Sequence, residues 1–542
     1  MHTEICYATR TPLALTYAIQ IQNNDHKCAA LAPHELVHNL WKAGPKAFAK
    51  SLLGPDGPSG VSSWWAAASQ DPAYRHHHMM QTPWLMALML PILIFVDGGE
   101  IFSNSEFLTF LWCCALATGE AIDVKFPIIC VRSMHLTKHT TKIAFLRDMC
   151  RFINWSLSCL EVGVGPERGF HGEYFEPDEI RSGLSKQPLA GKWRGCFAGL
   201  KTDGKARRET NLFLQHAQAT FICDSCYAIQ EFKHAPEVLN YTDFSEDAFW
   251  AETCFGTEHY LDVTPLHQRS PWCQVRGWAL ELNIPDGMHN DFLGIARDLG
   301  ASVIFAWLLA GLLGALTRDN ADSLLTGLTI RMFDWCKQRK IKKPFGKWFS
   351  IASLGRETLY EKKFPILHSS FRAASNKVIC VFLGHMASKL HPTSNRDKLA
   401  CTCILAYTDY HYVLDHEERL WSDSGRERAF HAAQLFLSCY QALAAHSSED
   451  DSYLWKLRPK FHYFDHDRRR RRNARFNPRY FTNFGEESMM GVIKAIGKKC
   501  HGTSASRRIL QRYLLLHARR LKQIESHTHF TKRSYTTQNT QF

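Results

Sequence analysis

The pattern of apolar and polar residues between positions 91 and 210 predicts four strands and one long helix. Short apolar runs bounded by turn-forming residues indicate buried strands, and they cover residues 92–96, 107–116, 126–131 and 195–200. Between residues 140 and 160 the apolar side chains recur at helical spacing, which predicts an amphipathic helix before the fourth strand. This part of the chain therefore has the pattern of an α/β protein.

The rest of the chain has a mainly helical pattern. We expect a helical N-terminal segment at residues 1–88, a first core segment at 89–215 and a mainly helical segment at 216–455. A second, basic core segment is expected at 456–525, with a basic helix at its end, and a disordered tail at 526–542.

The longest apolar stretch, residues 300–316, predicts a buried helix. It is shorter than the ~20 residues that a helix needs to span a bilayer. Asp298 and Arg318 bracket it closely. We therefore expect no membrane partner for this chain.

Three acidic residues stand in settings that suit metal chemistry. Asp97 ends the first apolar run, Asp203 follows the fourth, and Glu487 lies at a predicted helix start. A carboxylate just beyond a buried strand sits at the rim of the sheet, and three such groups can hold two Mg²⁺ or Mn²⁺ ions for in-line phosphoryl transfer.

Each acid also has an ordinary structural interpretation. Both aspartates precede a glycine, as in a common β-turn, and Glu487 is an acid at the favourable end of a helix. Glu486 is adjacent to Glu487, so the two point to different sides of the helix and only one would face the metals. The residues alone leave this choice open.

The charge of the chain is concentrated near its C-terminus. The net charge is +13 overall, but residues 451–542 hold 21 Lys and Arg against 6 Asp and Glu. Such asymmetry points to a polyanion, most often nucleic acid. The alternative is a solvated basic tail. The expected phosphate contacts are in two groups, Arg468, Arg469, Arg470, Arg471 and Arg472, and then Arg507, Arg508 and Arg512. The run of five arginines also suits a nuclear import signal.

Two of the 18 cysteines have the spacing of metal ligands. Cys223 and Cys226 form a Cys-x-x-Cys pair, which a structural Zn²⁺ site would complete with a second pair of ligands. The alternative is a pair of buried thiols. The candidates for the second pair are His234, Cys254, His259, His267, Cys273 and the pair Asp286 and His289.

Several of these segments, in this order, resemble the CACTA or Tnp2-like family of eukaryotic DDE transposases. The segment 285–298 is similar to the family's D-P-M-H-x-x-x-L-G block, with Asp286 and His289 as its Asp-x-x-His pair and Gly287 in place of the usual proline. Asp203 followed by the Cys-x-x-Cys pair, and the Lys-x-His-x-x-x-His block at 460–466, resemble the segments around the family's second and third acids.

The resemblance implies an RNase H-like core, a mixed sheet flanked by helices, interrupted by a large mainly α-helical insertion. It implies a nuclear protein that cuts and joins DNA at transposon ends and target sites, with Asp97, Asp203 and Glu487 as the catalytic acids and with the chain acting as a homo-oligomer. Two alternatives stay open: a domesticated copy that binds DNA without cutting it, and a helical scaffold protein whose acids are turn residues.

Overall fold

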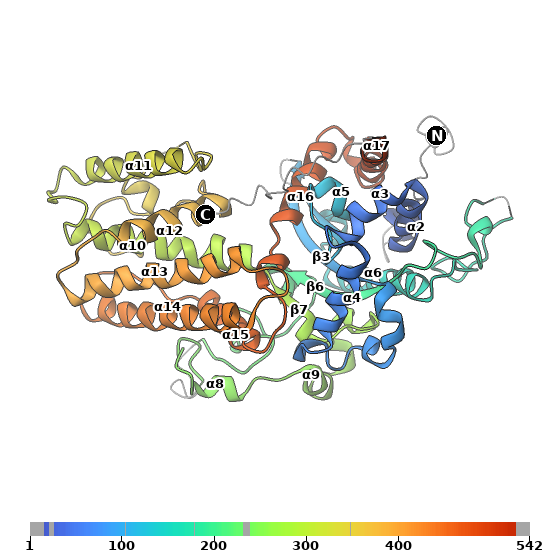
Figure 1. Cartoon of the computed structure of the whole chain (residues 1–542), viewed down its shortest axis with the longest axis horizontal. Coiled ribbons are helices and arrows are strands. Elements are labelled where there is room, and N and C mark those ends of the chain that lie inside the picture. The colour runs from blue at the N-terminus through green and yellow to red at the C-terminus, as the bar shows by residue number, and fades with distance from the viewer. Residues whose placement is uncertain are drawn as a thin grey trace. The chain divides into compact units, whose positions relative to one another are not determined.

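The computed structural model of this chain describes residues 16–20, 27–102, 105–177, 179–230, 239–346 and 348–526. The chain forms two compact units (Figure 1). Unit 1 comprises residues 1–214, 256–284 and 483–535, and unit 2 comprises residues 215–255, 285–482 and 536–542. Each is described separately below. The expected tail from residue 527 onward lies outside the described residues.

Unit 1 is built on a mixed β-sheet with the strand order β1-β2-β5-β4-β3-β6-β7. Strands β3, β4 and β5 form an antiparallel meander, and β6 pairs in parallel with β3. The strand bounds are β1 (Thr16–Gln20), β2 (Lys27–Leu31), β3 (Met89–Phe102), β4 (Ser105–Cys114), β5 (Phe126–Arg132), β6 (Arg194–Thr202) and β7 (Asn283–Pro285). The mixed α/β class and the four predicted strands, here β3 to β6, are thereby confirmed.

The N-terminal segment differs from the helical prediction. It contributes β1 and β2, and β2 pairs with β5 through Ala30 and Ile129 before the predicted helical pattern begins at α2 (Pro33–Ala43). Ala30 and Ile129 are both fully buried. Residues 28–31 of β2 are buried where the strand extends the sheet, a tertiary effect that local periodicity does not reveal.

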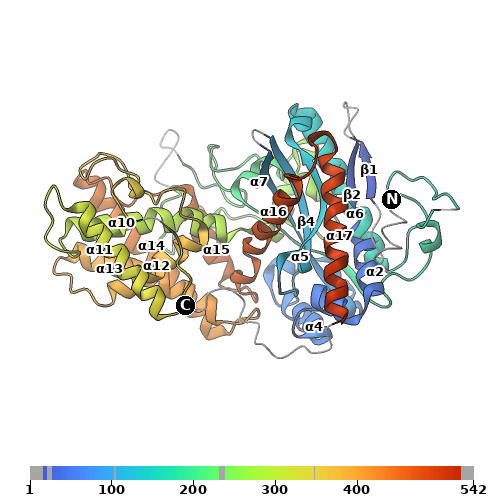
Figure 2. The same ribbon diagram turned by 90° about the horizontal axis from the view of Figure 1, so that it is seen from above.

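Helices cover both faces of the sheet. On one face lies α6 (His139–Val162), where Leu160 packs over Gly195 of β6 and Phe145 contacts Phe110 of β4. On the other face lie α16 (Phe484–Gly497) along β3 and α17 (Ala505–Ser526) along β2 and β5, side by side as Figure 2 shows. The shorter helices of this unit are α3 (Pro45–Phe48), α4 (Gly57–Ala68), α5 (Ala121–Val124), α7 (Gly204–Glu209) and α9 (Thr257–Val263).

Strand β6 contains one extra residue relative to β3. Ile92 pairs with Phe197, but the next residue, Leu93, pairs with Gly199, so Ala198 forms a bulge. Side chains alternate between the two faces of a sheet, and a bulge of one residue reverses that alternation. As a result, the end of β6 presents to α16 the side chains that would otherwise face α6.

Unit 2 is mainly helical. Its long helices are α10 (Ala296–Leu309), α11 (Ala321–Gln338), α12 (Ala373–Ala387), α13 (Asn395–His416), α14 (Asp423–Glu449) and α15 (Pro459–Arg471). Helices α13 and α14 pack against each other, α12 packs on α13, and α15 packs on α14 (Figure 1). Gly384 of α12 makes the approach to α13 possible, since a Cβ there would lie 2.6 Å from Oγ1 of Thr408.

Of the apolar stretch predicted as a buried helix, residues 300–309 lie in a core helix of unit 2, whereas residues 310–316 form turns and loop beyond its end. The continuous helical segment Met288–Leu309, of which α10 is the second part, is long and apolar enough to cross a membrane by length and composition alone, and 78% of its most apolar window is buried inside the protein. Trp307, Ile304 and Phe305 are fully buried. Such burial is that of a helix packed inside a compact unit.

The unit boundaries differ from the predicted domain boundaries in two places. Residues 456–482, which include α15, belong to unit 2, whereas the sequence pattern placed them with the core. Residues 256–284 belong to unit 1 although they were placed in the helical segment. The unit to which each segment belongs depends on tertiary packing.

Candidate functional site

The ends of β3 and β6 bring two of the predicted acids to neighbouring positions. Phe95 of β3 pairs in parallel register with Lys201 of β6. Asp97 follows Phe95 by two residues and Asp203 follows Lys201 by two residues, and Asp203 keeps an extended backbone with φ −81° and ψ 175°. Because neighbouring strands lie about 4.8 Å apart and side chains alternate, both acids project from the same edge and the same face of the sheet.

The N-terminal half of α16 lies over that face. A Cβ on Gly99 would lie 3.0 Å from the side-chain ends of both Met490 and Lys494. Glu487 precedes Met490 by three residues and Lys494 by seven, so the three side chains lie on one side of the helix. Glu487 is therefore on the side of α16 that faces β3, one turn before the contact with Gly99.

Glu486 lies in a different environment from Glu487. Its side chain is 1% exposed, and its Oε1 lies 2.7 Å from Nζ of both Lys125 and Lys201. Burial alone would raise the pKa of Glu486, but the two lysines outweigh burial and lower that pKa to about 2. A carboxylate neutralised by two buried lysines has its charge satisfied by the protein, which leaves Glu487 as the acid that α16 contributes to this edge of the sheet.

Local hydrogen bonds orient both aspartates. Oδ1 of Asp97 accepts from the backbone N–H of Gly98 at 2.7 Å. Oδ1 of Asp203 accepts from the backbone N–H of Ala206 at 2.6 Å and so caps α7 at its N-terminus. Each carboxylate is thus held in place by a backbone hydrogen bond to one of its oxygens. A carboxylate held in this way is already oriented before a cation binds. Oxygen donors on three carboxylates suit Mg²⁺ or Mn²⁺.

The five consecutive arginines are partly used inside unit 2. Arg468 is buried and pairs with the buried Asp465, with 2.8 Å between Nε and Oδ1. Arg469 pairs with the same aspartate at 3.1 Å, and Arg471 pairs with Asp467 at 2.5 Å. The first four arginines of the run form the last turn of α15, and Arg472 follows the helix. Arg468 holds no exposed charge to offer a phosphate.

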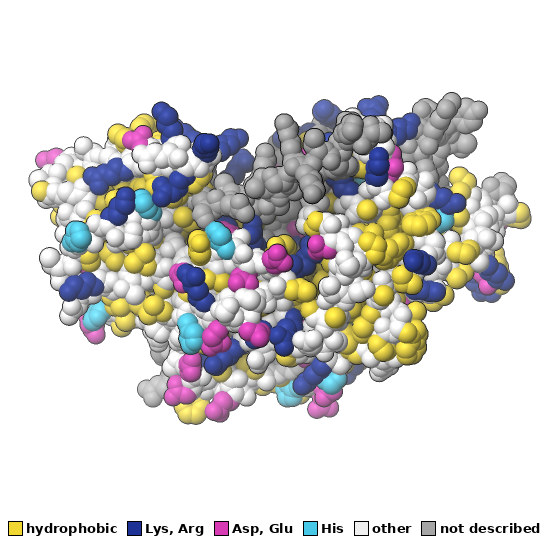
Figure 3. Space-filling view, in the orientation of Figure 1, with side chains coloured by type: hydrophobic (Ala, Val, Ile, Leu, Met, Phe, Trp, Pro, Cys, Tyr) yellow, Lys and Arg dark blue, Asp and Glu magenta, His cyan; other side chains and the backbone are white. Residues whose placement is uncertain are grey.

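The basic helix α17 has a different character. Arg507, Arg508 and Arg512 are exposed, and Arg512 donates to the backbone carbonyl of Lys499 at 2.7 Å. Arg520, further along, pairs with Asp123 at 2.9 Å. The N-terminal half of α17 therefore presents guanidinium groups to solvent in the same unit as the three acids. On the face seen in Figure 3, the basic side chains over unit 2 are instead dispersed among hydrophobic and neutral ones.

The Asp-x-x-His pair is a local structure at the start of the helical segment of unit 2. Asp286 is buried, and its carboxylate accepts from the backbone N–H of Met288 at 2.9 Å and of His289 at 3.2 Å. Nδ1 of His289 contacts the same carboxylate. Asp286 thus caps the π-helical turn Met288–Ile295 and holds the His289 ring.

A cluster of thiols and imidazoles in unit 2 includes the predicted Cys-x-x-Cys pair. The ligand atoms of Cys223, Cys226 and His462 all lie within 4.8 Å of one another, and all three residues are buried. Cys226 Sγ lies 3.3 Å from Nε2 of His462, and Cys254 Sγ lies 3.4 Å from Nε2 of His466. Of the second-pair candidates from the sequence, Cys254 is in this cluster, and His234 lies outside the described residues.

Electrostatics within this cluster favour charged forms. Burial lowers the pKa of His466, but the thiols of Cys223 and Cys254 outweigh burial and raise it to about 9. Hydrogen bonding from Cys226 lowers the pKa of the Cys254 thiol to about 5. Burial raises the pKa of the Cys223 thiol, but hydrogen bonding from Cys226 and the charges of the two histidines outweigh burial and lower that pKa well below its ordinary value. Burial raises the pKa of the Cys226 thiol. Cys223 and Cys254 therefore favour the thiolate, which is the form of cysteine that binds metals.

The histidines of the cluster were not among the predicted metal ligands. His462 and His466 stand four residues apart, so they lie on one side of α15. That spacing is the usual second half of a Cys₂His₂ site. The spacing of the two histidines is visible in the sequence. However, 236 positions separate Cys226 from His462, and zinc motifs are usually recognised only where both pairs of ligands lie close together in the sequence.

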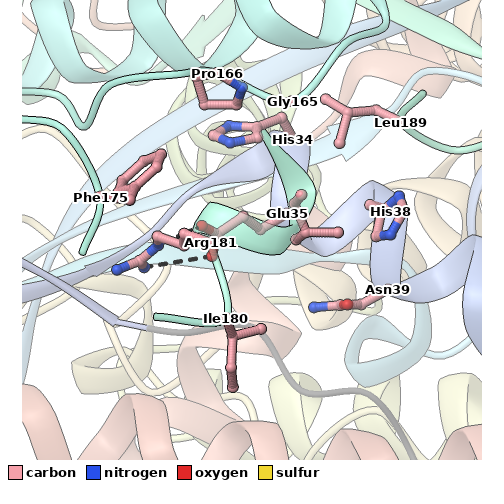
Figure 4. Close-up of a pocket in the computed structure, with 11 residues that line it drawn as sticks. His34, Glu35, His38, Asn39, Gly165, Pro166, Phe175, Ile180, Arg181 and Leu189 are labelled. Atoms are coloured by element: carbon pink, nitrogen blue, oxygen red, sulfur yellow. Dashed lines mark hydrogen bonds and ion pairs between the residues drawn. The ribbon is translucent and has the colours of Figure 1, made fainter. Parts of the chain in front are cut away.

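A separate pocket in unit 1 contains none of the predicted site residues. It lies between α2 and the connection at residues 165–189 (Figure 4). At its wall Arg181 donates to Glu35, with 2.7 Å between Nε and Oε1. His34 is buried and its Nδ1 lies 2.9 Å from the Ser156 hydroxyl. Glu35 and Arg181 thus neutralise each other at the wall of this pocket.

No protein-family model and no curated protein matches this chain.

Proposed function

We propose that this protein is a DDE-type DNA-cleaving and DNA-joining enzyme of the transposase kind, with Asp97, Asp203 and Glu487 as its acids. The observation that carries the proposal is the parallel register of β3 and β6, which sets Asp97 and Asp203 side by side on the face that α16 covers. The strand order supports it, because three antiparallel strands, a helix and a fourth strand beside the first are the first half of an RNase H core.

The three carboxylates would hold Mg²⁺ or Mn²⁺, which when bound supplies activation of the attacking hydroxyl group and stabilisation of the leaving oxygen. Asp97 and Asp203 are positioned by their backbone hydrogen bonds before any ion arrives. Glu487 is positioned by the buried pairs of Glu486 one residue earlier. Lys494, on the same side of α16, would supply a positive charge near the scissile phosphate.

Exposed arginines support DNA as the substrate. Arg507, Arg508 and Arg512 belong to the same unit as the acids and would contact phosphates without reading sequence. These contacts also favour the second candidate function, a protein that binds DNA without cutting it.

A nicking assay separates the two candidates. Supercoiled plasmid is incubated with the full chain and Mg²⁺ or Mn²⁺, and the wild type is compared with Asp97→Asn, Asp203→Asn and Glu487→Gln. We expect nicking by the wild type and its loss in each variant, with DNA binding retained. Glu258→Gln, an exposed acid on α9, is the control and should nick normally.

Two other outcomes of the nicking assay would contradict the enzymatic proposal. If the wild type binds DNA with a steep salt dependence but does not nick it with either ion, the non-cleaving function replaces the enzymatic one. If the three acid variants nick as well as the Glu258→Gln control, the acids are turn and helix-start residues and the proposal is wrong.

A further inference from the structure

We infer that unit 2 contains a structural zinc site with Cys223, Cys226, His462 and His466 as its four ligands. The inference goes beyond the proposed DNA chemistry, because all four residues belong to unit 2 and the three acids belong to unit 1. It also does not depend on whether the acids cut DNA.

The donor types select the metal. Two thiolates and two imidazoles in a tetrahedral arrangement are typical of Zn²⁺, whereas Mg²⁺ and Ca²⁺ take oxygen ligands. In a tetrahedral zinc site with bonds of about 2.3 Å to sulfur and 2.0 Å to nitrogen, neighbouring sulfur and nitrogen ligands are roughly 3.6 Å apart. The distance of 3.3 Å between Cys226 Sγ and His462 Nε2 is close to this value.

The two histidines approach the thiols together. Because they lie four residues apart on α15, one side of the helix carries both rings. Trp250 packs against both, with ring centroids 4.3 Å from His462 and 5.8 Å from His466. The indole therefore limits how each ring can turn.

Cys254 is the alternative to His466 as fourth ligand. Its thiol lies 3.4 Å from Nε2 of His466, so it borders the same space. Cys254 is an exposed residue, however, whereas Cys223, Cys226 and His462 are buried. Structural zinc sites are closed to solvent, and His466 with His462 has the spacing of such sites. We therefore assign His466.

The segment that carries the two cysteines has little secondary structure and a small core of its own. In its described residues, 215–230 and 239–255, the only helix is the four-residue α8 (Phe249–Glu252), and the strand contacts are single bridges. Its apolar core is small, formed by Ile222, Cys223, Cys226, Ala228, Ala248 and Trp250. A segment with so little buried surface is commonly held by a metal. The zinc ion would fasten it to α15, where Tyr463 already donates from its hydroxyl to the Ile222 carbonyl at 2.6 Å.

Metal analysis of the full chain tests the assignment. After expression with zinc and extensive dialysis, we expect about one zinc per chain in the wild type and in the control Cys336→Ser, a buried thiol of α11. Cys223→Ser, Cys226→Ser, His462→Ala and His466→Ala should each lose most of the zinc, and Cys254→Ser should keep it. A wild-type chain without zinc overturns the inference, and retention by His466→Ala with loss by Cys254→Ser overturns the choice of fourth ligand.

A second measurement covers the case in which the variants do not fold. Co²⁺ replaces zinc in the wild-type chain, and its visible spectrum should show the intense bands of a tetrahedral site with thiolate charge transfer. Hydrogen exchange with and without chelator should show faster exchange in 239–255 and in α15 after metal removal, and no change in α6. A spectrum of six-coordinate Co²⁺, or exchange that chelator leaves unchanged in all three segments, would contradict the inference. The Asp97→Asn variant should bind zinc as the wild type does, so failure of the DNA chemistry and failure of the zinc site are distinguishable.

Discussion

Lys201 and Glu486 form a buried ion pair, with 2.7 Å between Nζ and Oε1, that joins the end of β6 to the start of α16. Lys125 pairs with the same oxygen from the loop before β5. Two lysines against one carboxylate leave a surplus positive charge beside the edge from which Asp97 and Asp203 project. The pair thus fixes the helix that carries Glu487, and it does so without using Glu487 itself.

Glu486→Gln should destabilise unit 1 while Glu487→Gln should not. Removing the charge of Glu486 leaves two buried lysines without a counter-charge, which costs roughly 3–5 kcal/mol. Glu487 is partly exposed, and its replacement should change the free energy of unfolding by less than about 1 kcal/mol. Urea denaturation followed by fluorescence measures both. Equal destabilisation by the two variants would mean that they share one structural role.

The stability of unit 1 should fall at acid pH because of Glu486. Its pKa is about 2 in the folded protein, below the ordinary value of 4.5. A group with a lowered folded pKa stabilises the fold fully above its unfolded pKa, and that stabilisation is lost as the pH falls from about 4.5 toward 2. Urea midpoints measured between pH 6 and pH 2.5 should decline more steeply for the wild type than for Glu486→Gln. Parallel curves would exclude Glu486 as the source of the decline.

Three arginines of α17 should carry much of the DNA affinity. The triple variant Arg507→Gln, Arg508→Gln, Arg512→Gln should bind DNA of any sequence more weakly, and the slope of log K against log salt should fall by about 1 per lost phosphate contact. Fluorescence anisotropy at several salt concentrations measures the slope. The control Arg331→Gln, an exposed residue of α11, should leave it unchanged. An unchanged slope in the triple variant would place the DNA elsewhere.

Lys494→Gln should reduce DNA nicking more than DNA binding. Its side chain packs over Gly99, close to the edge that carries Asp97. A positive charge beside a reacting phosphate stabilises charge that develops in the transition state, and losing one such contact costs about a hundredfold in rate. Single-turnover nicking and anisotropy with the same DNA separate the two effects. Lys498→Gln, an exposed lysine at the end of α16, is the matched control. A variant that loses binding and nicking in the same proportion would make Lys494 an ordinary phosphate contact.

The core strands were predictable, and the N-terminal strands were not. The apolar runs around Ile94, Ile129 and Phe197 each fill a strand that is buried on both faces, so hydrophobicity alone marks them. The strand Lys27–Leu31 is only five residues long, and it is specified by the edge of β5 that it covers. A pairing partner about a hundred residues away leaves no local pattern in the sequence.

The acids could be singled out from the sequence, but their common orientation could not. Asp97 and Asp203 each follow an apolar run, and that position at a strand end was readable. Whether the two side chains share a face of the sheet depends on the bulge at Ala198, and no residue type in the strand predicts that bulge. The same limit applied to His462 and His466, since only the folded chain brings α15 to the Cys-x-x-Cys pair.

The bulge at Ala198 makes the number of residues in β6 a functional property of the chain. With one residue fewer between Cys196 and Asp203, the alternation of the strand would turn Lys201 away from Glu486 and Asp203 away from Asp97, with every other side chain of the site still present. A chain with a single residue deleted from this strand would therefore keep all three acids in its sequence and yet have lost their common arrangement. The length of the strand, as much as the identity of its residues, would distinguish chains that keep this arrangement from chains that have lost it.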